Sequence, residues 1–135
     1  MAGPMNPSQV LLIEDNAGDA LLVGQALAEG RVSVHLHIAR DVEQALQILK
    51  QADYKLDLII LDLHLPKVSG HSVLVLCVQT TSVVVFTASL DGEDENRVML
   101  LGAKEFVHKP IDLKDYKIAV CRMVRKWAVP KDSAA

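Results

Sequence analysis

The chain has 135 residues, of which 50% are hydrophobic and 23% are charged, and its formal net charge is -3. This length suits one domain and excludes two, and the composition excludes a disordered or collagen-like chain. The slight negative charge argues against nucleic acid as a partner. No apolar run approaches the roughly 20 residues that a membrane-spanning helix needs. Cys77 and Cys121 lie in no metal-binding spacing, so we expect reduced core thiols in a cytoplasmic protein.

The two ends of the chain differ from its middle. Residues 1–8 form a short segment that contains two prolines and no apolar stretch of its own, so they are expected to form a flexible arm and not a signal peptide. We therefore predict a single domain at residues 9–128, followed by a C-terminal tail at residues 129–135.

Within this domain, short apolar runs that are typical of buried strands alternate with stretches of helical spacing. In chain order, we expect a strand at 10–13, a helix at 20–29, a strand at 32–38, a helix opening at 41, strands at 56–61 and 83–86, a helix after the acidic residues 91–96, a strand at 106–107 and a helix at 113–128. Gly30 is a plausible stop for the first helix, and Asp41 with Gln44 forms a capping box for the second. This alternation predicts βαβ units, and therefore a doubly wound α/β domain with a five-stranded parallel sheet.

The segment between the third and fourth strands is the least regular part of the pattern. Residues 72–78 are rich in β-branched side chains and carry no charge, whereas a helix on the outside of a sheet should show charged positions. We therefore expect a third helix that is short, distorted or strand-like. An exposed apolar patch at this place could bind a partner or promote aggregation.

Polar side chains stand at the ends of four strands, where a doubly wound sheet places its ligand. Glu14 and Asp15 follow the first strand, Asp62 follows the third, Thr87 follows the fourth and Lys109 follows the fifth. Three carboxylates at one edge would repel one another by on the order of several kcal/mol unless cations enter. Lys109 supplies one positive charge, and the oxygen ligands suit Mg²⁺ or Mn²⁺, which also bind phosphate oxygens.

Each of these residues also has a plain structural interpretation. Asp15, followed by Asn16, could cap a helix. Thr87 could be a strand-end hydroxyl and Lys109 a surface lysine. Asp62 differs because it interrupts an apolar run, and a buried carboxylate is costly unless it is paired or functional. The occurrence of all of these groups at strand ends favours a functional site.

Over about residues 9–128, the sequence resembles the receiver domains of two-component response regulators. The matching segments, in the family's order and with nearly its spacing, are LIEDN at 12–16, LDLHLP at 61–66 with Gly70, FTA at 86–88 and KP at 109–110. Residues 14–20 and 109–113 look most like single-domain receivers of the kind paired with phytochrome-type kinases. The resemblance implies a flavodoxin-like fold with strand order 2-1-3-4-5 and helices on both faces. The chain is shorter than this family usually is between Gly70 and Thr87.

The resemblance implies a metal site at the carboxyl ends of the strands. Asp15 and Asp62 would bind Mg²⁺ directly, with the backbone carbonyl of His64 as a third ligand, and Glu14 would hold a metal-bound water. The side chain of His64 would lie near the phosphorylated group, so we predict that it modulates dephosphorylation without being required for phosphorylation.

The resemblance also implies a phosphoacceptor and a switch. Asp62 would take a phosphoryl group from a histidine kinase or phosphotransfer protein, by a transfer that depends on positioning and charge neutralisation. Lys109 would pair with the phosphate, and Thr87 would donate its hydroxyl to it. Movement of Thr87 would let Phe106 swing inward and change a protein-binding surface. Plain core packing is the alternative for Phe106.

The expected partners are a kinase and a downstream protein, with no nucleic acid and no membrane. The fourth helix begins with acidic residues and the last helix is basic, so two copies could pair across the face formed by the fourth helix, the fifth strand and the fifth helix. The charged residues are Asp91, Glu93, Asp94 and Glu95 on one side, and Lys114, Lys117, Arg122, Arg125 and Lys126 on the other. Two ordinary solvated faces are the alternative.

Three functions remain open from the sequence. The leading hypothesis is a phosphorylated switch that is not a turnover enzyme. The alternative is a pseudo-receiver that binds a partner without phosphate, although no acidic or lysine position is lost here. A phosphatase with an aspartyl nucleophile would usually carry a second acid two residues after the nucleophile, where this chain has His64.

Overall fold

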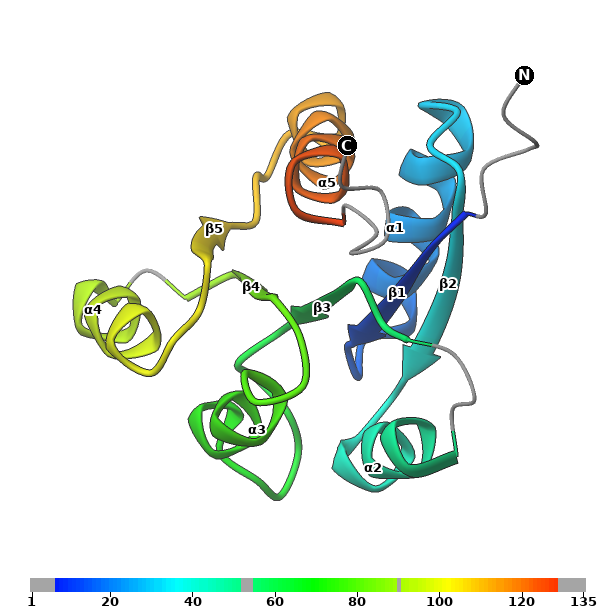
Figure 1. Cartoon of the computed structure of the whole chain (residues 1–135). Helices are drawn as coiled ribbons and strands as arrows, with labels where there is room; N and C mark the ends of the chain where they lie inside the picture. The colour runs from blue at the N-terminus through cyan, green and yellow to red at the C-terminus, as the bar shows by residue number, and fades with distance from the viewer. Residues whose placement is uncertain (1–6, 52–54, 90, 129–135) are drawn as a thin grey trace.

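A five-stranded sheet with the strand order β2-β1-β3-β4-β5 forms the centre of the protein (Figure 1). The computed structural model describes residues 7–51, 55–89 and 91–128. The strands are β1 (Ser8–Ile13), β2 (Val34–Ala39), β3 (Leu58–Leu61), β4 (Val83–Thr87) and β5 (Glu105–His108). The helices are α1 (Ala17–Glu29), α2 (Val42–Gln51), α3 (Gly70–Cys77), α4 (Gly92–Leu100) and α5 (Leu113–Trp127). All four strand pairs are parallel, so the predicted fold and strand order are confirmed.

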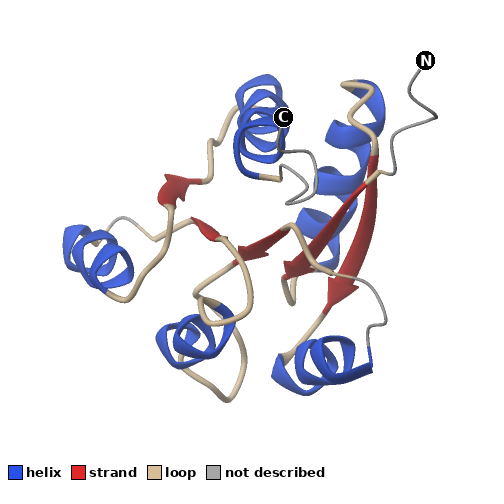
Figure 2. Ribbon diagram, in the orientation of Figure 1, coloured by secondary structure: helices blue, strands red, loops and turns tan. Residues whose placement is uncertain are grey.

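Helices cover both faces of the sheet, with α1 and α5 on one face and α2, α3 and α4 on the other (Figure 2). Successive residues of a strand point to opposite faces. In β1, Val10 and Leu12 therefore pack beneath α1 and α5, while Leu11 and Ile13 pack beneath the other three helices. This double burial explains why the strands are nearly continuous apolar runs, and it leaves the strand ends as the place for polar groups.

The helix starts follow local capping rules. Asn16 caps α1 by accepting a hydrogen bond from the backbone N–H of Asp19 at 2.9 Å. At the start of α2, the Asp41 carboxylate accepts from the N–H of Gln44 at 2.8 Å. The Gln44 side chain in turn accepts from the N–H of Arg40 at 2.7 Å. The predicted capping box is therefore present, with its return bond one residue earlier than in the usual arrangement.

The third helix is short but regular. The eight residues of α3 follow the cap Ser69, whose hydroxyl accepts from the N–H of His71 at 3.2 Å. Val73 and Leu74 are buried against the sheet, so tertiary packing overrides the strand preference of the β-branched residues. Of the three alternatives for this segment, a short helix is correct and a strand is wrong.

The ends of the described chain lie beside each other. The hydroxyl of Ser8 donates to the carbonyl of Ala128 at 2.7 Å. Since β1 begins at Ser8, the sheet starts one residue before the predicted domain boundary. Residues 1–6 of the predicted arm and the predicted tail at 129–135 lie outside the described residues. In the described part of the chain, no helix is both long and apolar enough to cross a membrane.

Candidate functional site

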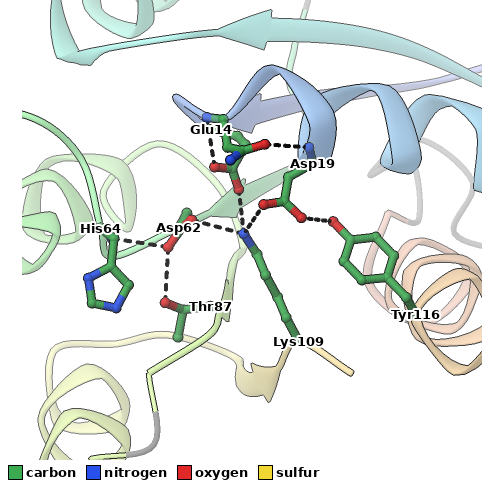
Figure 3. Close-up of polar contacts among 8 residues, drawn as sticks. Glu14, Asp19, Asp62, His64, Thr87, Lys109 and Tyr116 are labelled. Carbon is green, nitrogen blue, oxygen red and sulfur yellow. Dashed lines mark hydrogen bonds and ion pairs between the residues drawn. The ribbon is translucent and has the colours of Figure 1, made fainter. Parts of the chain in front are cut away.

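The parallel strands bring four predicted site residues together at one edge of the sheet (Figure 3). Ile13 of β1 is in register with Leu61 of β3, so the residues that follow them, Glu14 and Asp62, emerge side by side. Thr87 is the last residue of β4, and Lys109 comes directly after β5. The prediction that these groups converge is therefore correct, and each owes its position to the end of a buried strand.

Lys109 lies at the centre of a cluster of carboxylates. Its Nζ is 2.7 Å from Glu14 Oε2, 2.9 Å from Asp62 Oδ2 and 3.2 Å from Asp19 Oδ2. The lysine is buried, and its Nζ lies over the ring of Phe86, 5.8 Å from the ring centroid. The interpretation of Lys109 as an ordinary surface lysine is therefore wrong.

Asp62 is a buried carboxylate that accepts hydrogen bonds from three donors. Its Oδ1 accepts from Thr87 Oγ1 at 2.9 Å and from the His64 backbone N–H at 3.0 Å, while its Oδ2 accepts from Lys109. Only 5% of Asp62 is exposed. These donors offset the cost of burying a charge, and they fix the orientation of the carboxylate at the carboxyl ends of the strands.

The environment sets the protonation of the three central groups. Burial alone would raise the pKa of Asp62, but the His64 amide and Lys109 outweigh it, so the pKa lies below its ordinary value. Burial raises the pKa of Glu14 to about 7, with the charge of Asp62 adding to the rise and Lys109 opposing it. Burial would lower the pKa of Lys109, yet its bonds to Glu14 and Asp62 outweigh it and raise the pKa. Asp62 is therefore ionised, and Lys109 stays a cation.

The acidic residues of this edge suit a divalent cation. Carboxylate oxygens of Glu14, Asp15 and Asp62 all lie within 4.8 Å of one another, and Asp15 is the most exposed of the three. Lys109 neutralises only part of this negative charge. Hard oxygen donors in an incomplete cage fit Mg²⁺ or Mn²⁺, which keep water in the remaining positions.

Two residues of the network were not predicted from the sequence. Asp19, in the first turn of α1, contacts Lys109, and its Oδ1 accepts a 2.7 Å hydrogen bond from the hydroxyl of Tyr116 on α5 (Figure 3). An acid in the first turn after β1 is the one sequence signal that could have indicated Asp19. Nothing along the chain links it to Tyr116, which is 97 positions away.

Phe106 lies in the hydrophobic core of the domain. It is partly buried and packs with the core on the α2, α3 and α4 side of the sheet. Its partner in the sheet is Val85, whereas Thr87 is in register with His108. Core packing therefore describes Phe106 in this structure, and a switching role remains a prediction.

The family model described as the response regulator receiver domain matches residues 10–120. This chain belongs to that family. As a receiver, it is 34% identical over 126 residues to the response regulator Rcp1 of Synechocystis sp., covering 85% of this chain and 86% of Rcp1. Some other curated relatives are far longer, and the chain spans only 3% of the hybrid signal transduction histidine kinase G of Dictyostelium discoideum, at 26% identity over 84% of this chain.

Solved structures agree with this assignment. The receiver fold superposes on the phosphorylated cyanobacterial phytochrome response regulator RcpA with a TM-score of 0.82, at 28% identity, covering 90% of this chain and 94% of RcpA. It superposes on the Mn²⁺-bound form of Rcp1 with a TM-score of 0.80, at 29% identity, covering 96% of this chain and 98% of Rcp1. The resemblance to single-domain, phytochrome-associated receivers is thereby confirmed.

Proposed function

We propose that Asp62 accepts a phosphoryl group from a histidine kinase or phosphotransfer protein, and that this modification switches a protein-binding surface. The observation that carries the proposal is the ionised Asp62 carboxylate, buried at a sheet edge with Thr87 and Lys109 as donors. The relative RcpA, which is a phosphorylated phytochrome response regulator, supports the same chemistry.

The acidic cluster would hold Mg²⁺ or Mn²⁺. Asp15 and Asp62 would bind the ion directly, with the His64 backbone carbonyl, and Glu14 would bind it through a water. When bound, the ion would supply positive charge that offsets the charge of the phosphoryl oxygens. The relative Rcp1 binds Mn²⁺, which supports this choice of metal.

The chemistry assigned to the protein's own residues is an in-line displacement. A carboxylate oxygen of Asp62 forms a bond to phosphorus while the bond from phosphorus to the partner's histidine nitrogen breaks, and the electron pair of that bond returns to the imidazole. Asp62 becomes an acyl phosphate. Lys109 keeps an ammonium beside the transferred group, so positioning and electrostatics carry most of the catalysis.

The switch would begin at Thr87. Its hydroxyl already donates to Asp62 Oδ1, so a phosphoryl group on Asp62 would offer it a new, more highly charged acceptor close by. Movement of Thr87 would then free space for Phe106 and change the α4–β5–α5 face. This face is proposed as the surface that addresses the downstream protein.

A homodimer across the α4–β5–α5 face is part of the proposal. Some of the predicted cations already have partners within the chain, because Lys117 pairs with Glu29 and Arg122 pairs with Glu105. Their contribution to an interface would be reduced accordingly. Light scattering over a concentration series, with and without a phosphate mimic, tests the dimer, and a monomer in both states would exclude it.

The buried free thiols Cys77 and Cys121 suit a reducing compartment, so we place the protein in the cytoplasm. Fractionation of cells that express the full chain tests this location, and recovery outside the cytoplasmic fraction would contradict it.

Incubation with Mg²⁺ and acetyl phosphate, followed by intact-mass measurement, tests the phosphoacceptor. We expect a mass gain of one phosphate that requires both Mg²⁺ and Asp62, and that disappears in Asp62→Asn. Asp57→Asn is the matched control, because Asp57 flanks the opposite end of β3 and its carboxylate accepts a hydrogen bond from the Gln9 N–H there. A folded protein that takes no phosphate would support the pseudo-receiver, and turnover of a phosphate ester would support an enzyme.

A further inference from the structure

The proposed function explains two of the three carboxylates around Lys109 and leaves Asp19 without a role. Glu14 and Asp62 belong to the acidic group that could hold a metal ion, whereas Asp19 does not. Asp19 nevertheless lies 3.2 Å from the ammonium of the buried Lys109. Its other carboxylate oxygen is engaged by Tyr116.

We propose that Asp19, held by the Tyr116 hydroxyl, is a positioning residue that keeps the Lys109 ammonium beside Asp62 during phosphoryl transfer. This inference rests on the proposed function of Asp62. Asp19 and Tyr116 would act at that site through Lys109, without contacting the phosphoryl group.

Phosphoryl transfer would change the surroundings of Lys109. A lysine ammonium has three N–H donors, and in this structure three carboxylates surround it. Phosphorylation would turn Asp62 into an acyl phosphate, and metal binding would draw Glu14 toward a metal-bound water. Neither event acts on Asp19 directly, because it is not the phosphoacceptor and does not belong to the acidic group, so Asp19 can serve as the constant anchor of Lys109.

Tyr116 gives this anchor its rigidity. The tyrosine is buried on α5, and its ring meets that of Phe86 edge-on, with 5.1 Å between the centroids. Burial and the neighbouring Asp19 raise the pKa of the Tyr116 hydroxyl, which therefore stays protonated and donates its hydrogen bond. Phe86 also lies beneath Lys109, so one packed unit fixes both the carboxylate and the ammonium.

The hydroxyl and the ring of Tyr116 make different contacts, so their roles can be tested separately. Tyr116→Phe removes the 2.7 Å bond to Asp19 but retains the aromatic contact with Phe86. If the hydroxyl acts only through Asp19, its removal should matter in the wild-type protein and should have no effect once Asp19 has lost its charge. A purely structural role in packing would appear equally in both backgrounds.

Two measurements test the proposal on Asp19→Asn, Tyr116→Phe and the double variant. In the unphosphorylated protein, the side-chain ¹⁵N signal of Lys109 reports how well its ammonium is held and protected from hydrogen exchange. In the presence of Mg²⁺ and acetyl phosphate, intact-mass measurement gives the rate of labelling. Asp115→Asn is the control, because this exposed acid lies on the same helix as Tyr116 and its side chain has no contact with Lys109.

We expect Asp19→Asn to weaken the Lys109 signal and to slow labelling by about tenfold, since a misplaced catalytic group commonly costs one to two orders of magnitude. Tyr116→Phe should produce a smaller loss in both measurements, and the double variant should equal Asp19→Asn. Labelling that is unchanged or faster in Asp19→Asn would overturn the proposal, as would an equal loss from Tyr116→Phe in both backgrounds. Absence of labelling in the wild type would refute the proposed function, whereas the Lys109 signal would still decide the positioning.

Discussion

Glu14 should make the stability of the metal-free protein depend on pH. Only 2% of this residue is exposed, and burial is the main cause that raises its pKa from the ordinary value of 4.5 to about 7. The folded protein therefore holds the Glu14 proton more tightly than the unfolded chain does. The resulting contribution to stability is complete below pH 4.5 and is lost as the pH rises through about 7.

The size of this effect follows from the two pKa values. A difference of one pKa unit corresponds to about 1.4 kcal/mol, so the rise from 4.5 to about 7 corresponds to about 3 kcal/mol of unfolding free energy. The other buried charges change little in this window. The pKa of Asp62 is lowered below its ordinary value and that of Lys109 is raised above its own, so both groups keep their charge between them.

Urea denaturation at a series of pH values, without divalent cations, measures the effect. The free energy of unfolding of the wild type should fall by about 3 kcal/mol between pH 5 and pH 8, whereas Glu14→Gln should remove most of that slope. Glu43→Gln is the control, because Glu43 is an exposed acid of α2. Equal slopes in the wild type and Glu14→Gln would refute the reasoning.

Three further predictions concern other parts of the structure. His64→Ala should change the lifetime of the phosphorylated form but still allow labelling at an unchanged initial rate, because the backbone N–H of His64, which the substitution retains, contacts Asp62; loss of labelling would contradict this. Gly70→Ala should cost about 2 kcal/mol or more in urea denaturation, because an added Cβ would lie 2.5 Å from the backbone of Leu63; unchanged stability would contradict it. Burial would raise the pKa of Glu105, but its bonds to Arg122 outweigh burial and lower this pKa. The ionised Glu105 therefore stabilises the fold at pH values above its ordinary pKa, and this stabilisation is lost as the pH falls through the lowered pKa. Glu105→Gln should therefore lower the melting temperature at pH 7 and have little effect at pH 3, and an equal loss at both would refute this.

The parts of the site that could be predicted are those that follow from a single strand. An apolar run ends, and the next residue must lie at the carboxyl edge of the sheet, so Glu14, Asp62 and Thr87 could be placed by reading the chain alone. Lys109 could be placed in the same way, at the end of β5. The strand order then brings these residues together.

The parts that could not be predicted depend on contacts between distant elements. The bond between Asp19 and Tyr116 exists because α1 and α5 pack on the same face of the sheet, and neither residue interrupts a pattern in its own helix. The helical spacing of α5 groups Leu113 with the buried residues Tyr116 and Val120, yet 52% of Leu113 is exposed at the first position of the helix. The spacing of apolar residues identifies one face of a helix, but it does not show how far along the helix that face is covered by the sheet.

Mapping of the phosphorylated residue tests the central claim most directly. After labelling with acetyl phosphate and Mg²⁺, borohydride reduction converts an aspartyl phosphate to homoserine, which peptide mass spectrometry locates in the sequence. We predict homoserine at position 62 and at no other aspartate, including Asp15 and Asp19. Phosphate on another residue, or a folded protein that acquires none, would contradict it.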